Sequence, residues 1–233
     1  MKGLPTTIAI DGPAGSGKST LGALLAESLG YLYFDTGVMY RAVTLAALNA
    51  GLPMDDEEAV GEIAQQIMID VRPPSVEDGR DSDVYLDDVD VTWDIRKDAV
   101  NAHVSPVSTY GAVREAMTTQ QRRIASENKV VMVGRDIGTV VMPKADLKIF
   151  LDASVEVRAQ RRFQELLDRG WKTTFENVLG SLQNRDKIDS SRKIAPLRPA
   201  DDAIVINVDC LGIQQVLAKI NVLVQDWEKN NAK

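Results

Sequence analysis

The segment that most constrains this chain is a glycine-rich loop between an apolar run and a helix. Gly12 and Gly17, followed directly by Lys18 and Ser19, match the phosphate-binding pattern GxxxxGK[ST] at every fixed position. Glycine lets the backbone come close to a phosphate, so that successive N–H groups can point at the anion. The helix that follows directs its positive end at the same anion. The loop therefore predicts that the chain binds a nucleoside triphosphate.

The side chains of the loop have separate expected roles. Lys18 reaches the terminal phosphates, and the Ser19 hydroxyl is placed to ligate Mg²⁺. We expect the triphosphate to contact nine consecutive residues, Gly12, Pro13, Ala14, Gly15, Ser16, Gly17, Lys18, Ser19 and Thr20. Loops of this kind serve transferases, hydrolases and switches alike, so the rest of the chain has to decide between these classes.

Strands and helices alternate along most of the chain. Short apolar runs predict strands at 6–10, 31–34, 129–133, 147–151 and 203–207. Helical spacing of apolar residues predicts helices at 19–29, after 37 to about 49, and at 104–126, 154–169, 174–189 and 213–228. This alternation predicts an α/β fold with a parallel sheet that is covered on both faces.

Residues 69–93 interrupt the alternation with a polar, proline-containing stretch. Within it, 84–86 and 89–91 are short apolar runs on either side of Asp87 and Asp88, which predicts a small hairpin. We interpret this stretch as an inserted subdomain on the edge of the main sheet. The alternative is a long disordered loop.

Composition excludes several classes of function. The net charge of −7 argues against a general nucleic-acid surface, and no apolar run approaches the length of a membrane span. The single cysteine, Cys210, excludes an internal disulfide and a cysteine-based zinc cluster, and the single histidine, His103, excludes a histidine-ligated metal. We therefore expect a cytoplasmic protein that holds anionic substrates on locally converging arginines. We also expect it to be a monomer.

Two arginine-containing motifs directly follow predicted strands. Arg41 lies one turn into the helix after the 31–34 strand, and Arg135 and Asp136 lie between two glycines after the 129–133 strand. The carboxyl ends of parallel strands border the crevice in which α/β sheets bind ligands. Both motifs are candidates for binding a second substrate, although Arg41 taken alone fits a surface arginine equally well.

Arginines are also dense in the C-terminal third. Arg158, Arg161 and Arg162 share one helix face without alternating glutamates, so they repel one another unless an anion neutralises them. Arg185 and Arg192 follow at a helical spacing of seven residues. Phosphoryl transfer needs such cations, because charge spreads over the equatorial oxygens in the transition state. On a mobile flap they would also exclude water.

Taken together, these motifs closely resemble those of bacterial cytidylate kinases. The resemblance rests on 12–19, 35–41, 134–141, 148–153 and 185–192, and extends from about 6 to 207. It implies a P-loop nucleoside monophosphate kinase fold, with a three-layer core at about 1–35, 104–153 and 193–233. A monophosphate-binding part with the insert would span about 36–103, and an arginine-rich lid about 154–192. The implied reaction transfers the γ-phosphoryl group of ATP to CMP or dCMP with Mg²⁺.

The resemblance also implies roles for single residues. The CMP phosphate would be held by Thr36, Arg41 and Arg135, and the cytosine ring would face Ser105, Arg114 and Asp136. Asp189 and Arg192 would lie near the ribose and phosphates. The residues implied in catalysis are Lys18, Arg135, Arg185 and the three lid arginines, Arg158, Arg161 and Arg162, which would close on the ATP phosphates.

Val133 departs from the family pattern, in which the residue before Gly134 is usually acidic. A carboxylate at this position could position Mg²⁺ or orient Arg41 and Arg135, so we expect its absence to lower turnover. Asp11 and Asp35 are the other carboxylates expected nearby.

Two other functions are also compatible with the phosphate loop. A kinase of another nucleotide or of a small hydroxylated metabolite would use the same fold and chemistry. A nucleotide-dependent switch would instead hydrolyse slowly and signal by its conformation, but the chain has no clear guanine-reading Asn-Lys-x-Asp motif.

Overall fold

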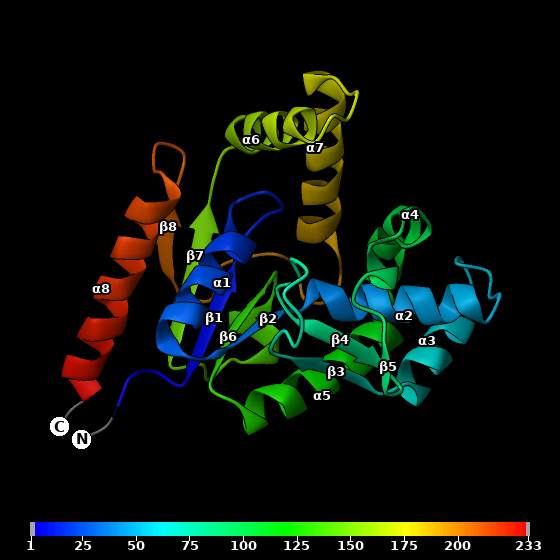
Figure 1. Cartoon of the computed structure of the whole chain (residues 1–233), viewed down its shortest axis with the longest axis horizontal. Helices are drawn as coiled ribbons and strands as arrows, with labels where there is room; N and C mark the ends of the chain where they lie inside the picture. The colour runs from blue at the N-terminus through cyan, green and yellow to red at the C-terminus, as the bar shows by residue number, and fades with distance from the viewer. Residues whose placement is uncertain (1–2, 232–233) are drawn as a thin grey trace. The chain divides into compact units, whose positions relative to one another are not determined.

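The computed structural model describes residues 3–231, and their elements are labelled in Figure 1. The chain divides into two compact units: unit 1 comprises Met1–Leu25 and Val133–Lys233, and unit 2 comprises Ala26–Met132. Helix α1 (Lys18–Leu29) and strand β6 (Val130–Gly134) cross the two boundaries. No helix in the described range is long and apolar enough to span a membrane.

Parallel strands form the framework of unit 1. Strands β1 (Thr7–Asp11), β7 (Leu147–Asp152) and β8 (Ile204–Asn207) pair in this order, with Ile8 opposite Leu147 and Ile149 opposite Ile204. β1 and β7 are almost entirely buried, as expected for apolar runs in a sheet that is covered on both faces. This confirms the predicted parallel α/β fold. β8 is an edge strand, and its Ile204 and Val205 are exposed.

Two helices stand beyond the carboxyl end of β7 (Figure 1). α6 (Val155–Asp168) and α7 (Phe175–Ser191) begin at Ser154 and Thr174, whose side chains accept hydrogen bonds from the first turn of each helix. They share a small apolar cluster with the phosphate loop, made of Ala14, Ala159, Val178 and Leu182. The pair occupies the segment predicted as the lid. Unit 1 also contains a π-helical turn, η2 (Ile137–Val141), and the C-terminal helix α8 (Ile213–Asn231).

Unit 2 is mostly helical. Its helices are α2 (Gly37–Asn49), α3 (Glu57–Gln66), α4 (Asp98–Val107) and α5 (Gly111–Glu127), with a short 3₁₀ turn, η1 (Asp94–Arg96), before α4. Strand β2 (Leu32–Asp35) lies next to β6, and the backbone N–H of Leu32 donates to the Lys129 carbonyl at 2.9 Å.

Two helical features of unit 2 differ from the prediction. The single helix expected at 104–126 is two helices, because α4 ends at Val107 and α5 begins only at Gly111. α3 was not predicted. It begins at Asp56, whose carboxylate accepts from the Ala59 N–H at 3.0 Å. A Cβ at Gly61 would come within 2.7 Å of the Ala112 Cβ, so this glycine allows α3 to pack closely on α5.

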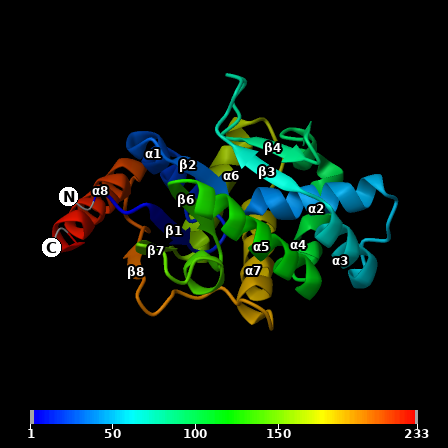
Figure 2. The same cartoon turned by 90° about the horizontal axis from the view of Figure 1, so that it is seen from below.

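The polar insert is an ordered sheet, not a long disordered loop. Strands β3 (Ile69–Arg72), β4 (Asp83–Leu86) and β5 (Val89–Asp90) are antiparallel, and Figure 2 shows β3 and β4 side by side. The predicted hairpin is confirmed, with Asp87 and Asp88 at φ of 47° and 65°, as a tight primed turn requires. The three strands form their own sheet, as expected for an inserted subdomain.

The burial difference between β7 and β8 gives a stability prediction. Leu151 is 0% exposed in β7, whereas Val205 in β8 is 55% exposed. Leu151→Ala should lower the free energy of unfolding by about 2–5 kcal/mol, because it removes buried surface and leaves a cavity. Val205→Ala should change it by less than about 0.5 kcal/mol. Urea denaturation of both variants measures the difference, and equal losses would contradict the burial assigned to the two strands.

Candidate active site

The phosphate loop needs glycine at three positions. Gly12, Gly15 and Gly17 have φ of 150°, 76° and 90°, which residues with a side chain rarely adopt. Gly12 also lies so close to the Leu151 carbonyl oxygen that a Cβ would collide with it. These three glycines therefore allow the backbone conformation between β1 and α1, as the sequence predicts.

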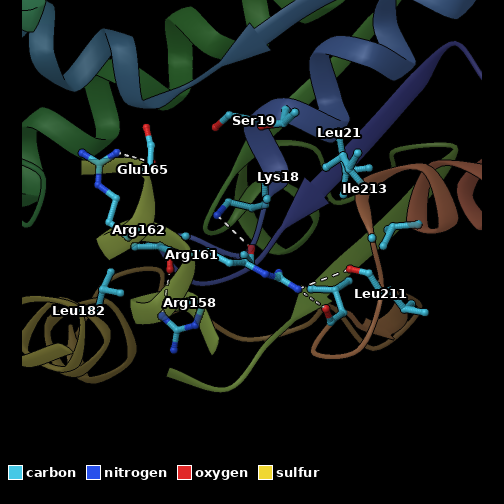
Figure 3. Close-up of a pocket in the computed structure, with 18 of the residues that line it drawn as sticks. Lys18, Ser19, Leu21, Arg158, Arg161, Arg162, Glu165, Leu182, Leu211 and Ile213 are labelled. Carbon is cyan, nitrogen blue, oxygen red and sulfur yellow. Dashed lines mark hydrogen bonds and ion pairs between the residues drawn. The ribbon is translucent and has the colours of Figure 1, made fainter. Parts of the chain in front are cut away.

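A cavity of about 630 Å³ opens in front of this loop (Figure 3). It is lined by the loop and the first turn of α1, by arginines of α6 and α7, and by the segment between β8 and α8. The main polar lining residues are Lys18, Ser19, Thr20, Arg158, Arg161, Arg162, Glu165 and Arg185. Its volume lies in the range of small-molecule and cofactor sites.

Lys18 forms part of the wall of this cavity. Its side chain is buried, and its Nζ donates to the Pro13 carbonyl at 2.6 Å, the bond drawn as a dashed line in Figure 3. The ammonium group is thus held on the loop itself. A phosphate anion would offer it a charged acceptor in place of a neutral carbonyl, and charge-assisted hydrogen bonds are the stronger ones.

Arg158 has partners on three parts of unit 1. It is 3% exposed, and it donates to the Ala153 and Ala14 carbonyls, each at 2.9 Å. It also forms a bidentate ion pair with Asp186 of α7, at 3.1 and 2.6 Å. The guanidinium therefore ties the phosphate loop to the end of β7 and to α7.

The other two lid arginines are also engaged (Figure 3). Arg161 Nη2 donates to the Val208 carbonyl at 2.7 Å, and Arg162 Nη1 pairs with Glu165 at 2.7 Å. The expectation that only a bound anion could neutralise this helix face was wrong, because Asp186 and Glu165 supply negative charge from the next helix and the next turn. All three arginines nevertheless line the cavity. Their role toward ATP stays a prediction.

Four residues expected at the acceptor form one alternating network in unit 1. Arg135 Nε donates to Asp189 at 2.9 Å, and Arg192 Nη2 donates to Asp136 at 3.3 Å. Arg192 Nη1 lies 3.9 Å from Asp189, which closes the network. The structure thus brings together the segment after β6 and the end of α7, more than 50 residues apart in sequence.

Arg185, also expected at the acceptor, lies in α7 of unit 1 and lines the cavity, and the remaining expected acceptor residues lie in unit 2. Arg41 of α2 donates to the Ile95 carbonyl at 3.1 Å and to Asn101 at 2.6 Å. Burial lowers the pKa of Arg41, and the nearby Asp35 carboxylate opposes that shift.

Arg114 of α5 is buried and donates to the Ser108 carbonyl at 3.0 Å, with its guanidinium 5.4 Å from the centre of the Tyr40 ring. Ser105 lies in α4, and its carbonyl accepts from the Ser108 hydroxyl at 2.8 Å. Thr36, which is buried, directly precedes α2.

Asp11 is a buried carboxylate to which sequence reasoning gave no defined role. It is 4% exposed, and its two oxygens accept from the backbone N–H groups of Ile137 and Gly138 at 2.8 and 2.7 Å. Burial raises the pKa of Asp11 to about 6, although the two N–H groups oppose that shift. The available sequence signal was an acidic residue at the end of a buried strand, directly before the loop.

Val133 is fully enclosed in β6, with an exposed fraction of 1%. An acidic residue at this position would be buried and would lose its hydration. The apolar side chain is thus compatible with the surrounding core, and whether it lowers turnover stays a prediction.

Comparison with known proteins shows similarity to cytidylate kinases over nearly the whole chain. Residues 8–226 match the model of the cytidylate kinase family. The chain is 53% identical over 217 residues to a cytidylate kinase from Chloroflexus aggregans, with 93% of each chain covered. It is 48% identical over 220 residues to one from Herpetosiphon aurantiacus, with 94% of each covered. It is 46% identical over 214 residues to one from Bacillus pumilus, with 92% and 93% covered.

The match extends over the phosphate loop, both arginine motifs and the lid helices, and the identities hold over nearly the full length of the chain and of these relatives. The chain belongs to the cytidylate kinase family.

Proposed function

We propose that this protein transfers the γ-phosphoryl group of ATP to CMP or dCMP, giving ADP and CDP or dCDP. The observation that carries the proposal is that one cavity in unit 1 combines the phosphate loop, Lys18 and four arginines. Phosphoryl transfer needs little covalent chemistry from a protein, and depends on positioning and on cations around the transferred group. Membership of the cytidylate kinase family specifies the acceptor.

On the donor side, the backbone of residues 12–20 would hold the ATP phosphates. Lys18 would exchange the Pro13 carbonyl for a terminal phosphate oxygen, because the phosphate offers a charged acceptor at the same place. The Ser19 hydroxyl lines the cavity and would ligate Mg²⁺ that is bound mainly by the phosphates. When bound, this ion neutralises charge that develops between the β- and γ-phosphates.

The lid arginines would surround the same phosphates. Arg162 and Arg185 line the cavity. Within residues 3–231, Arg162 is held by an exposed ion pair with Glu165, which contributes little free energy. Arg162 is therefore free to turn toward a phosphate at small cost. Arg158 is held by Asp186 and two carbonyls, so we propose that it contacts the phosphates without changing its conformation.

On the acceptor side, the proposed ligands of CMP are Thr36, Arg41, Ser105, Arg114, Arg135, Asp136, Arg185, Asp189 and Arg192. The network of unit 1 supports the assignment of its own four members, because its two arginines can bind an anionic phosphate and its two carboxylates can accept from hydroxyl and amine groups. Arg135 would bind the phosphate, and the Asp189 carboxylate would accept from ribose hydroxyls. The Asp136 carboxylate would accept from the exocyclic amine of cytosine.

The setting of this activity is also a proposal. The single cysteine fits a reducing compartment, so we infer a cytoplasmic enzyme. The net charge of −7 argues against nucleic acid as a partner. We propose that it acts as a monomer on small nucleotides.

An acceptor panel tests the function. With ATP and Mg²⁺, ADP release should require CMP or dCMP. It should be much slower with UMP, which lacks the amine from which Asp136 accepts, and with AMP, whose purine ring is larger than the cytosine ring. ADP release is measured by a coupled assay with each acceptor and with none. Turnover without any acceptor would favour the switch, and response to AMP alone would favour another kinase.

Arg135→Ala tests the assignment of the acceptor phosphate. Loss of a charged hydrogen-bond donor should raise the KM for CMP by about 10- to 100-fold. The KM for ATP should change by less than about threefold, since the variant leaves the phosphate loop untouched. Steady-state kinetics with each substrate varied in turn measure both values. Arg198→Ala, which removes an exposed arginine paired only at 3.8 Å, is the control and should leave both unchanged. Equal loss for both substrates would contradict the assignment.

Val133→Glu tests the departure from the family pattern. We expect a folded variant with a higher kcat, because a carboxylate at this position can orient the acceptor arginines. Its thermal midpoint should fall, since the new carboxylate is buried. Val133→Gln has the same shape without the charge and is the matched control. If kcat of the folded glutamate variant does not exceed that of the glutamine variant, Val133 is no catalytic deficit.

A further inference from the structure

Asp11 connects the two substrate-binding segments of unit 1. It is the last residue of β1 and directly precedes Gly12, the first residue of the phosphate loop. Its carboxylate accepts from the N–H groups of Ile137 and Gly138, which directly follow Arg135 and Asp136. One buried side chain thus joins the segment assigned to ATP and the segment assigned to CMP.

We propose that Asp11 is a positioning residue that holds Arg135 and Asp136 in place against the phosphate loop. It touches neither substrate in this role. The inference rests on the proposed function, since it takes CMP as the ligand of Arg135 and Asp136.

The geometry gives the Ile137–Gly138 segment little freedom. Ile137 and Gly138 begin the π-helical turn η2, so their N–H groups require acceptors from outside that turn. Asp11 supplies both, one on each oxygen. Behind Gly138, a Cβ would meet the Lys148 side chain at 3.2 Å and Asp11 Oδ2 at 3.4 Å. The segment is therefore fixed between Asp11 and Lys148, and Arg135 lies two residues before it.

Only the ionised form of Asp11 can do this at both oxygens. A protonated carboxyl carries an O–H donor, which would face an N–H donor instead of accepting from it. The charged groups that act on Asp11 are Asp136, which raises its pKa, and Lys18, which lowers it, while Lys148 behind Gly138 is paired with Asp202. Since burial raises the pKa of Asp11 to about 6, the link should weaken within an accessible pH range.

Asp11→Asn is the direct test, because an amide keeps the shape but replaces one acceptor oxygen by a donor. At pH 8 the variant should show a KM for CMP about tenfold or more above wild type, and a reduced kcat. The KM for ATP should change by less than about threefold. This split is expected because Asp11 holds the residues assigned to CMP, whereas the glycine backbone of the phosphate loop sets its own conformation.

The pH profile distinguishes positioning from a merely structural role. As pH falls from 8 to 5, protonated wild type comes to resemble the variant, so the ratio of the two KM values for CMP should fall toward 1. CMP itself titrates near pH 6, but this affects both proteins equally and cancels in the ratio. A KM ratio that stays constant with pH would overturn the proposal.

Asp146→Asn is the matched control at the opposite end of β1. Asp146 Oδ2 accepts from the N–H and hydroxyl groups of Thr6 and Thr7 at 2.8–3.1 Å, far along the strand from the phosphate loop. This variant should lose thermal stability while its KM for CMP stays within about twofold of wild type. A rise equal to that of Asp11→Asn would show that general loosening of β1 explains both, and would overturn the proposal.

Gly138→Ala approaches the same link from the other side and replaces Asp11→Asn if that variant does not fold. Its Cβ would push between Lys148 and Asp11, so the KM for CMP should rise while the KM for ATP is retained. A folded variant with an unchanged KM for CMP would sink the positioning role. Wild type that releases no ADP with CMP or dCMP would instead refute the proposed function, which keeps the two failures distinct.

Discussion

The nucleotide cavity depends on one buried guanidinium, that of Arg158. It donates to carbonyls of the phosphate loop and of the residue after β7, and it pairs with Asp186 on α7. The loop contributes backbone, the strand sets its position, and α7 carries Arg185 and Asp189, with Arg192 directly after its end. Removing a single partner from such a buried pair would leave an uncompensated charge, which is strongly destabilising. The relation of α7 to the phosphate loop is therefore fixed by electrostatics in addition to apolar contacts.

The same principle explains how a chain of net charge −7 can offer cations to a nucleotide. Asp186, Asp189, Asp136 and Glu165 each hold an arginine through its own ion pair. Without these carboxylates the arginines would repel one another and would not share one region. An incoming phosphate then needs only to compete with, or add to, a partner that is already present. Exposed pairs such as Arg162 with Glu165 are weak and easily exchanged, whereas buried pairs preserve the geometry of the site.

Local signals in the sequence predicted most of the fold, whereas contacts between residues far apart in sequence could not be predicted. The loop from Gly12 to Ser19 was predictable because its glycines are required by backbone conformation, and strand positions followed from continuous apolar runs. The break at Ser108 was missed because helical spacing continues across it, and α3 was missed because its pattern is short and polar. The partners of Arg135 and Arg158 lie 54 and 28 residues away, so no periodicity reveals them. The role of Asp11 was not predictable either, because its partners Ile137 and Gly138 lie 126 and 127 residues away in sequence.

Asp11 makes the folded protein less stable at neutral pH than a well-matched neutral group would. A carboxyl whose pKa is raised from 3.8 to about 6 binds more protons folded than unfolded between those values. Stability contributed by the neutral form is therefore lost as pH rises through that window, by about 3 kcal/mol in total. This loss of stability arises because the charge is buried. The two hydrogen bonds from Ile137 and Gly138, which only the charged form can accept together, partly offset it. Strongly perturbed carboxyls of this kind cluster at functional sites. At Val133, one position before Gly134, the chain instead has an apolar side chain with no such cost, so in this protein Asp11 alone of the two positions bears a buried negative charge.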